Sequence, residues 1–273
     1  MENRNIKKSV ILFSIVAVSS GWIGILVEKL LAGHLKEGDT PGMGLWLLFP
    51  VMTAILIRVF MKNGWKSLGI RPKFKGNVKW YIISAIIFPI IFIIVLVLGY
   101  ITNWTDMSKL DIGRIMFVFL GVFVGSFIKN IFEECAWRGF LTERLIKLKI
   151  SDGFMYFITA IIWFMWHIPY YLVLLSSNGT SENRIKLLII AFITLGCWSM
   201  MFTELYRLTR SIWPCVVLHA TVNSLVVIND YISISSGKGL FLSYDTGIIS
   251  LAICICVGIC LRRYRKRQII AIC

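Results

Sequence analysis

The sequence predicts an all-α, polytopic membrane protein with about eight transmembrane helices and with both termini in the cytoplasm. Three observations support this fold class: the large share of apolar residues, their arrangement in long blocks, and the placement of basic residues between the blocks. Of the 273 residues, 58% are hydrophobic and only 16% are charged. An ordinary soluble domain is about 45–50% apolar and about 25% charged. The composition therefore excludes a disordered chain and a coiled coil, and it argues against a soluble globular domain.

Eight apolar blocks are candidate spans, several of them at the short end of the roughly 17–25 residues that a span needs. They cover Val10–Val27, Met43–Phe60, Trp80–Ile101, Ile115–Ile131, Met155–Leu175, Leu187–Phe202, Ile212–Ile228 and Gly247–Leu261. The first block is long for the apolar part of a signal peptide, so we expect a retained anchor. No internal repeat or soluble domain is visible, and we expect residues 1–273 to form a single integral membrane domain.

The basic residues follow a topology rule. The chain carries 29 Lys and Arg against 14 Asp and Glu, a formal net charge of +15. In a soluble protein this excess would suggest nucleic acid as a partner. With eight spans and a cytoplasmic N-terminus, 21 of the basic residues fall on the inner side and 7 on the outer side. This split follows the positive-inside rule, so we expect the lipid bilayer, and no nucleic acid, as the partner.

An acidic pair lies at the end of the fourth block, where Glu133 and Glu134 are followed by Arg138. An ionisable residue within a span indicates a functional site by default. On a helix Glu134 and Arg138 share one face, so we expect Arg138 to keep Glu134 ionised. Glu133 would then lie beside a like charge in a poorly hydrated place, which favours its protonated form and suits a general base acting on water. The alternative is a solvated helix end with one surface ion pair.

Two histidines also lie within spans. His167 is deep in the fifth block, where Trp163 can cover the imidazole and Pro169 frees a backbone carbonyl one turn back. His219 and Asn223 lie four residues apart in the seventh block and share a helix face. Taken alone, each motif is also explained by structure: a core histidine bound to the irregular backbone, or a hydrogen bond between membrane helices.

Together these groups indicate hydrolysis. Two carboxylates, two imidazoles, an amide and a guanidinium in one layer of a bundle are costly unless they are used. They offer a base for one water and donors for a developing oxyanion. No Gly-x-Ser-x-Gly or catalytic-cysteine motif accompanies them, so we expect no covalent nucleophile. The seven cysteines lack the spacing of a tetrahedral metal site, and we interpret them as small buried apolar residues.

The motifs resemble those of the CPBP family, which includes type II CAAX prenyl endopeptidases and bacterial bacteriocin-processing or immunity proteins. The family pattern is E-E-x-x-x-R, then F-x-x-x-H, then H-x-x-x-N. The matching residues here are Glu133-Glu134-x-x-x-Arg138, Trp163-x-x-x-His167 and His219-x-x-x-Asn223. Trp163 departs from the family's Phe but is another bulky aromatic residue. The matching core covers about residues 115–230.

The resemblance implies an eight-helix intramembrane endopeptidase that cleaves a membrane-associated or lipidated, CAAX-like peptide or protein. Glu133 would activate the water that attacks the scissile carbonyl, and His167 would help to position that water. His219 and Asn223 would stabilise the oxyanion.

Glu134, Arg138 and Trp163 would support these catalytic residues. The enzyme would be of the glutamate type or a metalloprotease, and no cofactor is certain. Zinc is possible, because Glu and His side chains ligate it. Its candidate ligands would be Glu133, His167 and His219.

Two other classes of function stay open. A non-catalytic bacteriocin-immunity or sensor-partner membrane protein could keep the motifs for structure alone. A transporter could line a path with the same charges, but the sequence shows no repeated halves. Frequent Ile, Lys and Asn residues indicate an AT-rich prokaryotic genome, so we expect the protein in a prokaryotic cell membrane.

Overall fold

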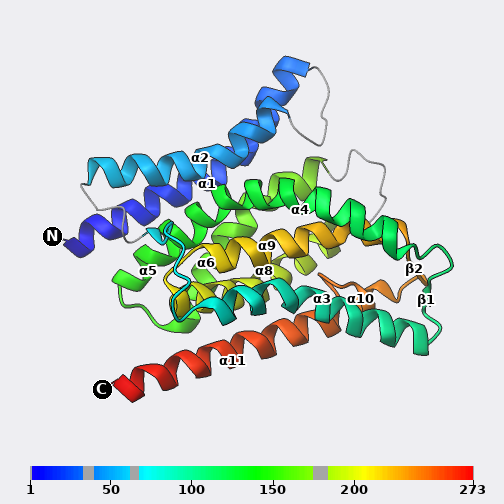
Figure 1. The fold of residues 1–273 in the computed structure, drawn as a ribbon. Helices are drawn as coiled ribbons and strands as arrows, with labels where there is room; N and C mark the ends of the chain where they lie inside the picture. The colour runs from blue at the N-terminus through cyan, green and yellow to red at the C-terminus, as the bar shows by residue number, and fades with distance from the viewer. Residues whose placement is uncertain (1, 33–39, 62–67, 175–183, 273) are drawn as a thin grey trace. The chain divides into compact units, whose positions relative to one another are not determined.

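The computed structural model is built almost entirely of helices (Figure 1) and describes residues 2–32, 40–61, 68–174 and 184–272. The chain divides into two compact units. The first consists of Met1–Ile70 and Phe132–Ser199, and the second of Arg71–Ile131 and Met200–Cys273. Two helices contribute residues to both units: α4 (Ile112–Glu134) and α8 (Arg184–Thr209).

The predicted fold class, an all-α polytopic membrane protein, is confirmed. Within the described residues, six helical stretches are long and apolar enough to cross a membrane: Glu2–Leu31, Pro41–Phe60, Val78–Ile101, Ile112–Lys147, Asp152–Leu174 and Arg184–Thr209. They correspond to the first six predicted spans, although Leu175 at the end of the fifth lies outside the described residues. The last two predicted spans are helical but are not among these six. The number eight and the cytoplasmic placement of the termini therefore stay predictions.

In the first unit, α1 (Glu2–Ala32) and α2 (Pro41–Phe60) lie side by side (Figure 1). Glycines allow this close approach: a Cβ atom on Gly24 would lie 2.5 Å from the Gly42 carbonyl oxygen. The Gly42 N–H donates to the Glu28 carboxylate at 3.1 Å. The indole N–H of Trp166 in α6 (Asp152–Pro169) donates to Ser20 Oγ of α1 at 3.1 Å. Small residues and buried hydrogen bonds thus hold α1 against its two neighbours, as expected for membrane helices.

In the described part of the first unit, two segments are π-helical. The segment η2 (Cys135–Thr142) follows α4 and leads into α5 (Glu143–Lys147), and η3 (Tyr170–Leu174) follows α6. The start of η3 has a local cause, because Pro169 lacks the N–H that would continue the α-helical ladder. No such residue precedes η2. Short π-helical segments frequently occur at functional sites, and both of these adjoin residues of the predicted motifs.

Two basic residues that the positive-inside count places on the inner side of the membrane are buried. Arg58 is 1% exposed; its Nη2 donates to the Gly139 carbonyl at 3.0 Å and contacts Glu143 at 3.4 Å. Arg144 is also 1% exposed. These arginines lie inside the first unit and not in a solvated loop. Their side chains therefore take part in packing inside the unit, in addition to the charge that they contribute to the positive-inside count.

The second unit contains a buried ion pair of the same kind. Glu204 of α8 is fully buried and accepts hydrogen bonds from Arg265 Nε at 2.5 Å and Arg265 Nη2 at 3.1 Å. Arg207 Nη1 donates to the same carboxylate at 3.2 Å. Arg265 belongs to α11 (Ile248–Ile272). The pair therefore ties the last helix to α8 within this unit.

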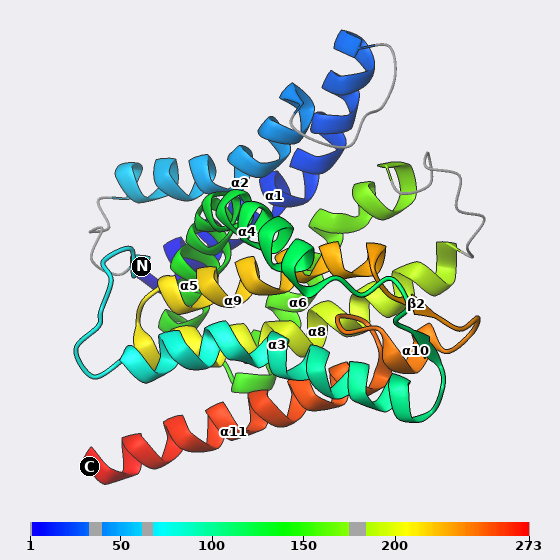
Figure 2. The ribbon, with the colours of Figure 1, turned by 45° about the vertical axis from the view of Figure 1, so that its right-hand side comes forward.

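Helix α3 (Val78–Ile101) packs against both α9 (Trp213–Ser224) and α11 in the second unit (Figure 2). Helix α9 continues as a 3₁₀ segment, η4 (Leu225–Asp230), and α10 (Gly239–Leu242) precedes α11. A minimal antiparallel sheet joins β1 (Thr105–Asp106) to β2 (Ser233–Ile234). The sequence analysis did not predict this sheet, because two-residue strands leave no alternating pattern.

The interpretation of the cysteines is confirmed in part. Cys197, Cys215 and Cys254 are buried, and Cys135 is partly buried. The interpretation is wrong for two cysteines of α11, which are exposed on the protein surface: Cys256 and Cys260. Cys273 lies outside the described residues.

Replacing Gly42 with Ala is expected to destabilise the protein, because the new methyl group would collide with the Gly24 carbonyl and with Glu28. Such overpacking costs about 1–3 kcal/mol, measurable as a lower midpoint of thermal unfolding in detergent. Gly44, two residues later in the same helix, has open space at its Cβ position. Gly44→Ala should therefore leave the midpoint unchanged or raise it. Equal losses in the two variants would contradict this packing.

Candidate active site

The predicted contact between Glu134 and Arg138 is present in the first unit. Arg138 Nη1 donates to Glu134 Oε1 at 2.9 Å, and both side chains are fully buried. Glu133 is also buried, with 3% of its surface exposed. The alternative of a solvated helix end with a surface ion pair is therefore wrong. Buried charges of this kind need their partners, because removing one leaves the other uncompensated.

Trp163 links this ion pair to His167. The Arg138 guanidinium carbon lies 4.4 Å from the centroid of the Trp163 ring, a cation–π contact. The Trp163 carbonyl oxygen lies 2.9 Å from His167 Nδ1. A carbonyl only accepts, so Nδ1 carries the proton and the lone pair of the neutral imidazole is on Nε2. His167 thus presents a defined nitrogen that can accept a proton or orient a water molecule.

The carbonyl that binds His167 is not the one that Pro169 frees. Pro169 frees a carbonyl one turn before itself, and the structural alternative for His167 is a bond to this irregular backbone. The acceptor is instead the carbonyl of Trp163, one turn before His167 itself. Pro169 ends α6, and the π-helical segment η3 begins after it.

A group of tryptophans surrounds this part of the first unit, of which sequence reasoning identified only Trp163. The neighbouring ring centroids lie 5.5–6.4 Å apart in the order Trp46, Trp166, Trp137, Trp163 and Trp198. All five side chains are buried, and buried apolar surroundings strengthen the electrostatic interactions of nearby polar groups. The spacing of Trp163 and Trp166, three residues apart on one helix, is the signal that could have indicated the group.

The second unit holds His219 and Asn223, one turn apart on α9 as predicted. His219 is 4% exposed, and its ring lies edge-on to Phe202 with centroids 5.5 Å apart. Asn223 Nδ2 donates to Oδ1 of Asn130 in α4 at 3.4 Å. This bond between helices agrees with the structural alternative for Asn223. Asn130 itself is fully buried and is a polar residue that sequence reasoning missed, although it lies beside Lys129 within the fourth apolar block.

The predicted site residues thus fall into two sets. The first unit connects Glu134, Arg138, Trp163 and His167 through successive contacts and contains Glu133. The second unit contains His219 and Asn223. In the part of the chain that the structure describes, no three His, Cys, Asp or Glu side chains form a group that could hold a metal ion.

The comparison with protein families identifies the segment that carries these motifs. Residues 114–225 match the type II CAAX prenyl endopeptidase Rce1-like family. This match supports membership of the CPBP family. The resemblance inferred from the motifs is therefore confirmed, and the Rce1-like segment nearly coincides with the core expected at 115–230. The match supports a protease of the CAAX type. Against curated proteins, the chain gives no match.

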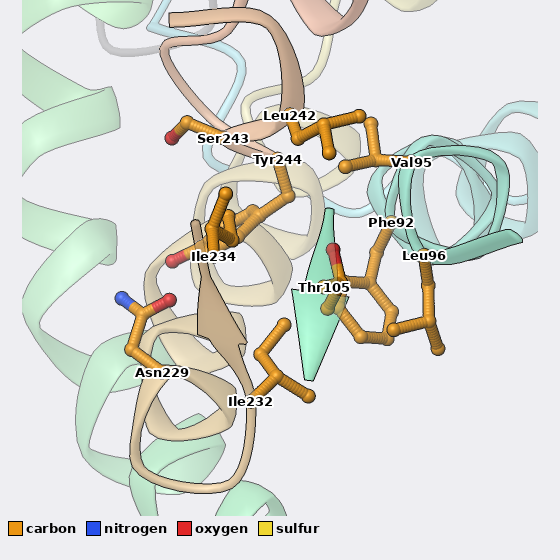
Figure 3. Close-up of a pocket in the computed structure, with 10 residues that line it drawn as sticks. All are labelled: Phe92, Val95, Leu96, Thr105, Asn229, Ile232, Ile234, Leu242, Ser243 and Tyr244. Atoms are coloured by element: carbon orange, nitrogen blue, oxygen red, sulfur yellow. The ribbon is translucent and has the colours of Figure 1, made fainter. Parts of the chain in front are cut away.

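Two cavities are lined by none of the Rce1-like motif residues. A groove of about 700 Å³ in the first unit is lined by side chains of α1 and α2, among them Lys8 and Phe60. A cavity of about 40 Å³ in the second unit lies beside the small sheet, with Thr105, Asn229 and Tyr244 among its lining residues (Figure 3). The smaller cavity has room for about one water molecule, so it is no peptide site.

Replacing Arg138 with Met is expected to destabilise the protein by about 3–5 kcal/mol, because the Glu134 carboxylate would stay buried without its partner. The double variant Glu134→Leu with Arg138→Met should recover much of the loss in thermal unfolding midpoint, since no charge is stranded.

Lys147→Met provides the matched control. Lys147 pairs with Glu143 at 2.8 Å but is 38% exposed, and exposed pairs contribute about 0–1 kcal/mol. A loss in the Arg138→Met variant no larger than in this control would show that the buried pair is not needed for stability.

Proposed function

We propose that the protein is an intramembrane endopeptidase that hydrolyses a peptide bond of a membrane-associated or lipidated, CAAX-like peptide or protein, using a water molecule activated by Glu133. One observation carries the proposal: a buried acidic pair of which Glu134 is bound by Arg138. Glu133 is the second carboxyl, next to a like charge and at the point where α4 gives way to η2. Both features suit a general base.

The proposed reaction starts with the carboxylate form of Glu133. Glu133 takes a proton from water while the water oxygen attacks the scissile carbonyl carbon. The protonated Glu133 then gives this proton to the leaving amide nitrogen as the C–N bond breaks. His167, held through Nδ1 by the Trp163 carbonyl, orients the water through Nε2. No covalent intermediate with the enzyme is needed.

His219 and Asn223 are proposed to stabilise the negative charge that develops on the carbonyl oxygen. An imidazole N–H and an amide N–H can both donate to an oxyanion, and fixed donors in a site that excludes water are worth more than donors in bulk water. His219 is buried and held by Phe202, and Asn223 is held by Asn130. The proposal requires that these donors and Glu133 act on the same peptide bond.

The proposed substrate follows from the surroundings of the motifs and from the family. The motifs lie on apolar helices, which suits a substrate that is already in the membrane. The family is described as prenyl endopeptidases, which supports a lipidated or membrane-tethered peptide. We also propose that residues 1–273 act as one integral membrane domain in a prokaryotic cell membrane.

A Glu133→Gln variant is expected to lose cleavage by at least about 10²-fold in kcat, because the amide cannot act as a general base. The assay compares purified proteins in detergent against prenylated and unmodified membrane-tethered peptides. Glu2→Gln makes the same change at an exposed position and should cleave like the unaltered protein. Full activity of the Glu133→Gln variant, in the assay or in cells, would favour the non-catalytic immunity or sensor-partner function.

Chelators are expected to leave the cleavage rate unchanged, because Glu133 and His167 can activate water without a metal. The measurement compares initial rates before and after treatment with phenanthroline or EDTA, with the thermal unfolding midpoint as the control for folding. Loss of the rate on chelation and its return with zinc would contradict the glutamate mechanism. It would then assign a metal to the candidate ligands Glu133, His167 and His219.

A further inference from the structure

Asn130 is a primary amide in the interior of a membrane helix. It lies in α4, three residues before Glu133, and its side chain is fully buried. Residues three apart on a helix lie on neighbouring parts of one face. None of the three motifs includes Asn130.

Only one of the two polar atoms of the Asn130 side chain makes a hydrogen bond within the described residues. Its Oδ1 accepts from Asn223 Nδ2 at 3.4 Å. Its own Nδ2 is buried and makes no hydrogen bond to any residue that the structure describes. A buried donor that makes no bond costs free energy that a single interhelical hydrogen bond does not fully repay.

An apolar residue of similar size would pack in this place without that cost, so stability alone does not account for an amide here. What the amide does provide is an acceptor for Asn223. Asn223 has two N–H groups on Nδ2, and the bond to Asn130 occupies one of them. Because the amide group is planar, this bond also fixes the direction of the second N–H.

We infer that Asn130 is a positioning residue that aims the second Nδ2 N–H of Asn223 at the oxyanion of the substrate. The inference rests on the proposed function, in which Asn223 and His219 stabilise that oxyanion. Asn223 is only partly buried, so its amide has a side that a peptide can approach. His219 lies one turn before Asn223 on α9. Asn130 acts through Asn223 and makes no contact of its own with the substrate.

The test replaces Asn130 with Leu in two backgrounds, the unaltered protein and Asn223→Ala. In the unaltered background kcat is expected to fall roughly 10–100-fold with KM little changed, because a misdirected donor affects the transition state and not substrate binding. In the Asn223→Ala background the same change should have no further effect on kcat. Asn229→Leu, an exposed Asn beyond the end of α9, is the matched control and should keep the original kcat.

A second readout does not depend on cleavage. The ligand is a membrane-tethered peptide in which a non-hydrolysable tetrahedral hydroxyl group replaces the scissile carbonyl. Its binding is measured in the Glu133→Gln protein. Asn130→Leu should weaken this binding by a factor similar to its effect on kcat, and again only where Asn223 is present.

The outcomes separate the two claims. Asn130→Leu could reduce kcat equally in both backgrounds, or it could lower the unfolding midpoint and leave kcat and analogue binding unchanged. Either result would overturn the role of Asn130 and leave the proposed function intact. The unaltered protein could instead cleave nothing, while analogue binding falls only when Asn130 is changed in the presence of Asn223. This result would overturn the hydrolysis and uphold only that Asn130 directs the Asn223 amide. Neither cleavage nor analogue binding by the unaltered protein would overturn both.

Discussion

The ion pair of Glu134 and Arg138 is the constraint on which the rest of the first unit depends. A carboxylate and a guanidinium that are fully buried among apolar helices must bind each other, because either one alone would be an uncompensated charge. Trp163 covers the guanidinium with its ring and binds His167 through its carbonyl. The buried ion pair is therefore connected to His167 through successive contacts from Glu134 to Arg138, Trp163 and His167. The second unit meets the same requirement at Glu204, which Arg207 and Arg265 bind.

The fold class could be predicted because lipid imposes a simple rule on composition: long apolar blocks form helices, and basic residues gather on one side. Helix boundaries are predicted well where a loop ends a block: the second and third predicted spans end at Phe60 and Ile101, as α2 and α3 do. Other features have no such signal. The π-helical segment η2 contains no proline, and the two-residue strands are too short for any pattern. The burial of Arg58 depends on Gly139 and Glu143, more than 80 residues away in the chain, and no local pattern contains that information.

The site was predictable to the extent that its contacts are local. Glu134 and Arg138 are one helical turn apart, so helix geometry alone predicts their contact. The same geometry predicts that His219 and Asn223 lie one turn apart on the same face of a helix. The partner of Asn223 is Asn130, 93 residues earlier in the chain, and the tryptophans around Trp163 come from four helices. Sequence reasoning therefore identified residues that carry chemistry and missed the neighbours that orient them.

The central claim is that the motifs of the two units serve one reaction, and kinetic coupling tests it most directly. The measurement is kcat/KM for the single variants Glu133→Gln and His219→Ala and for the double variant, each checked for folding. Residues that act as one catalytic unit are strongly non-additive, so that removing one costs nearly as much as removing both. The account predicts that the double variant is no more than a few fold slower than the slower single variant. Losses that multiply would contradict it, because the two residues would then act independently.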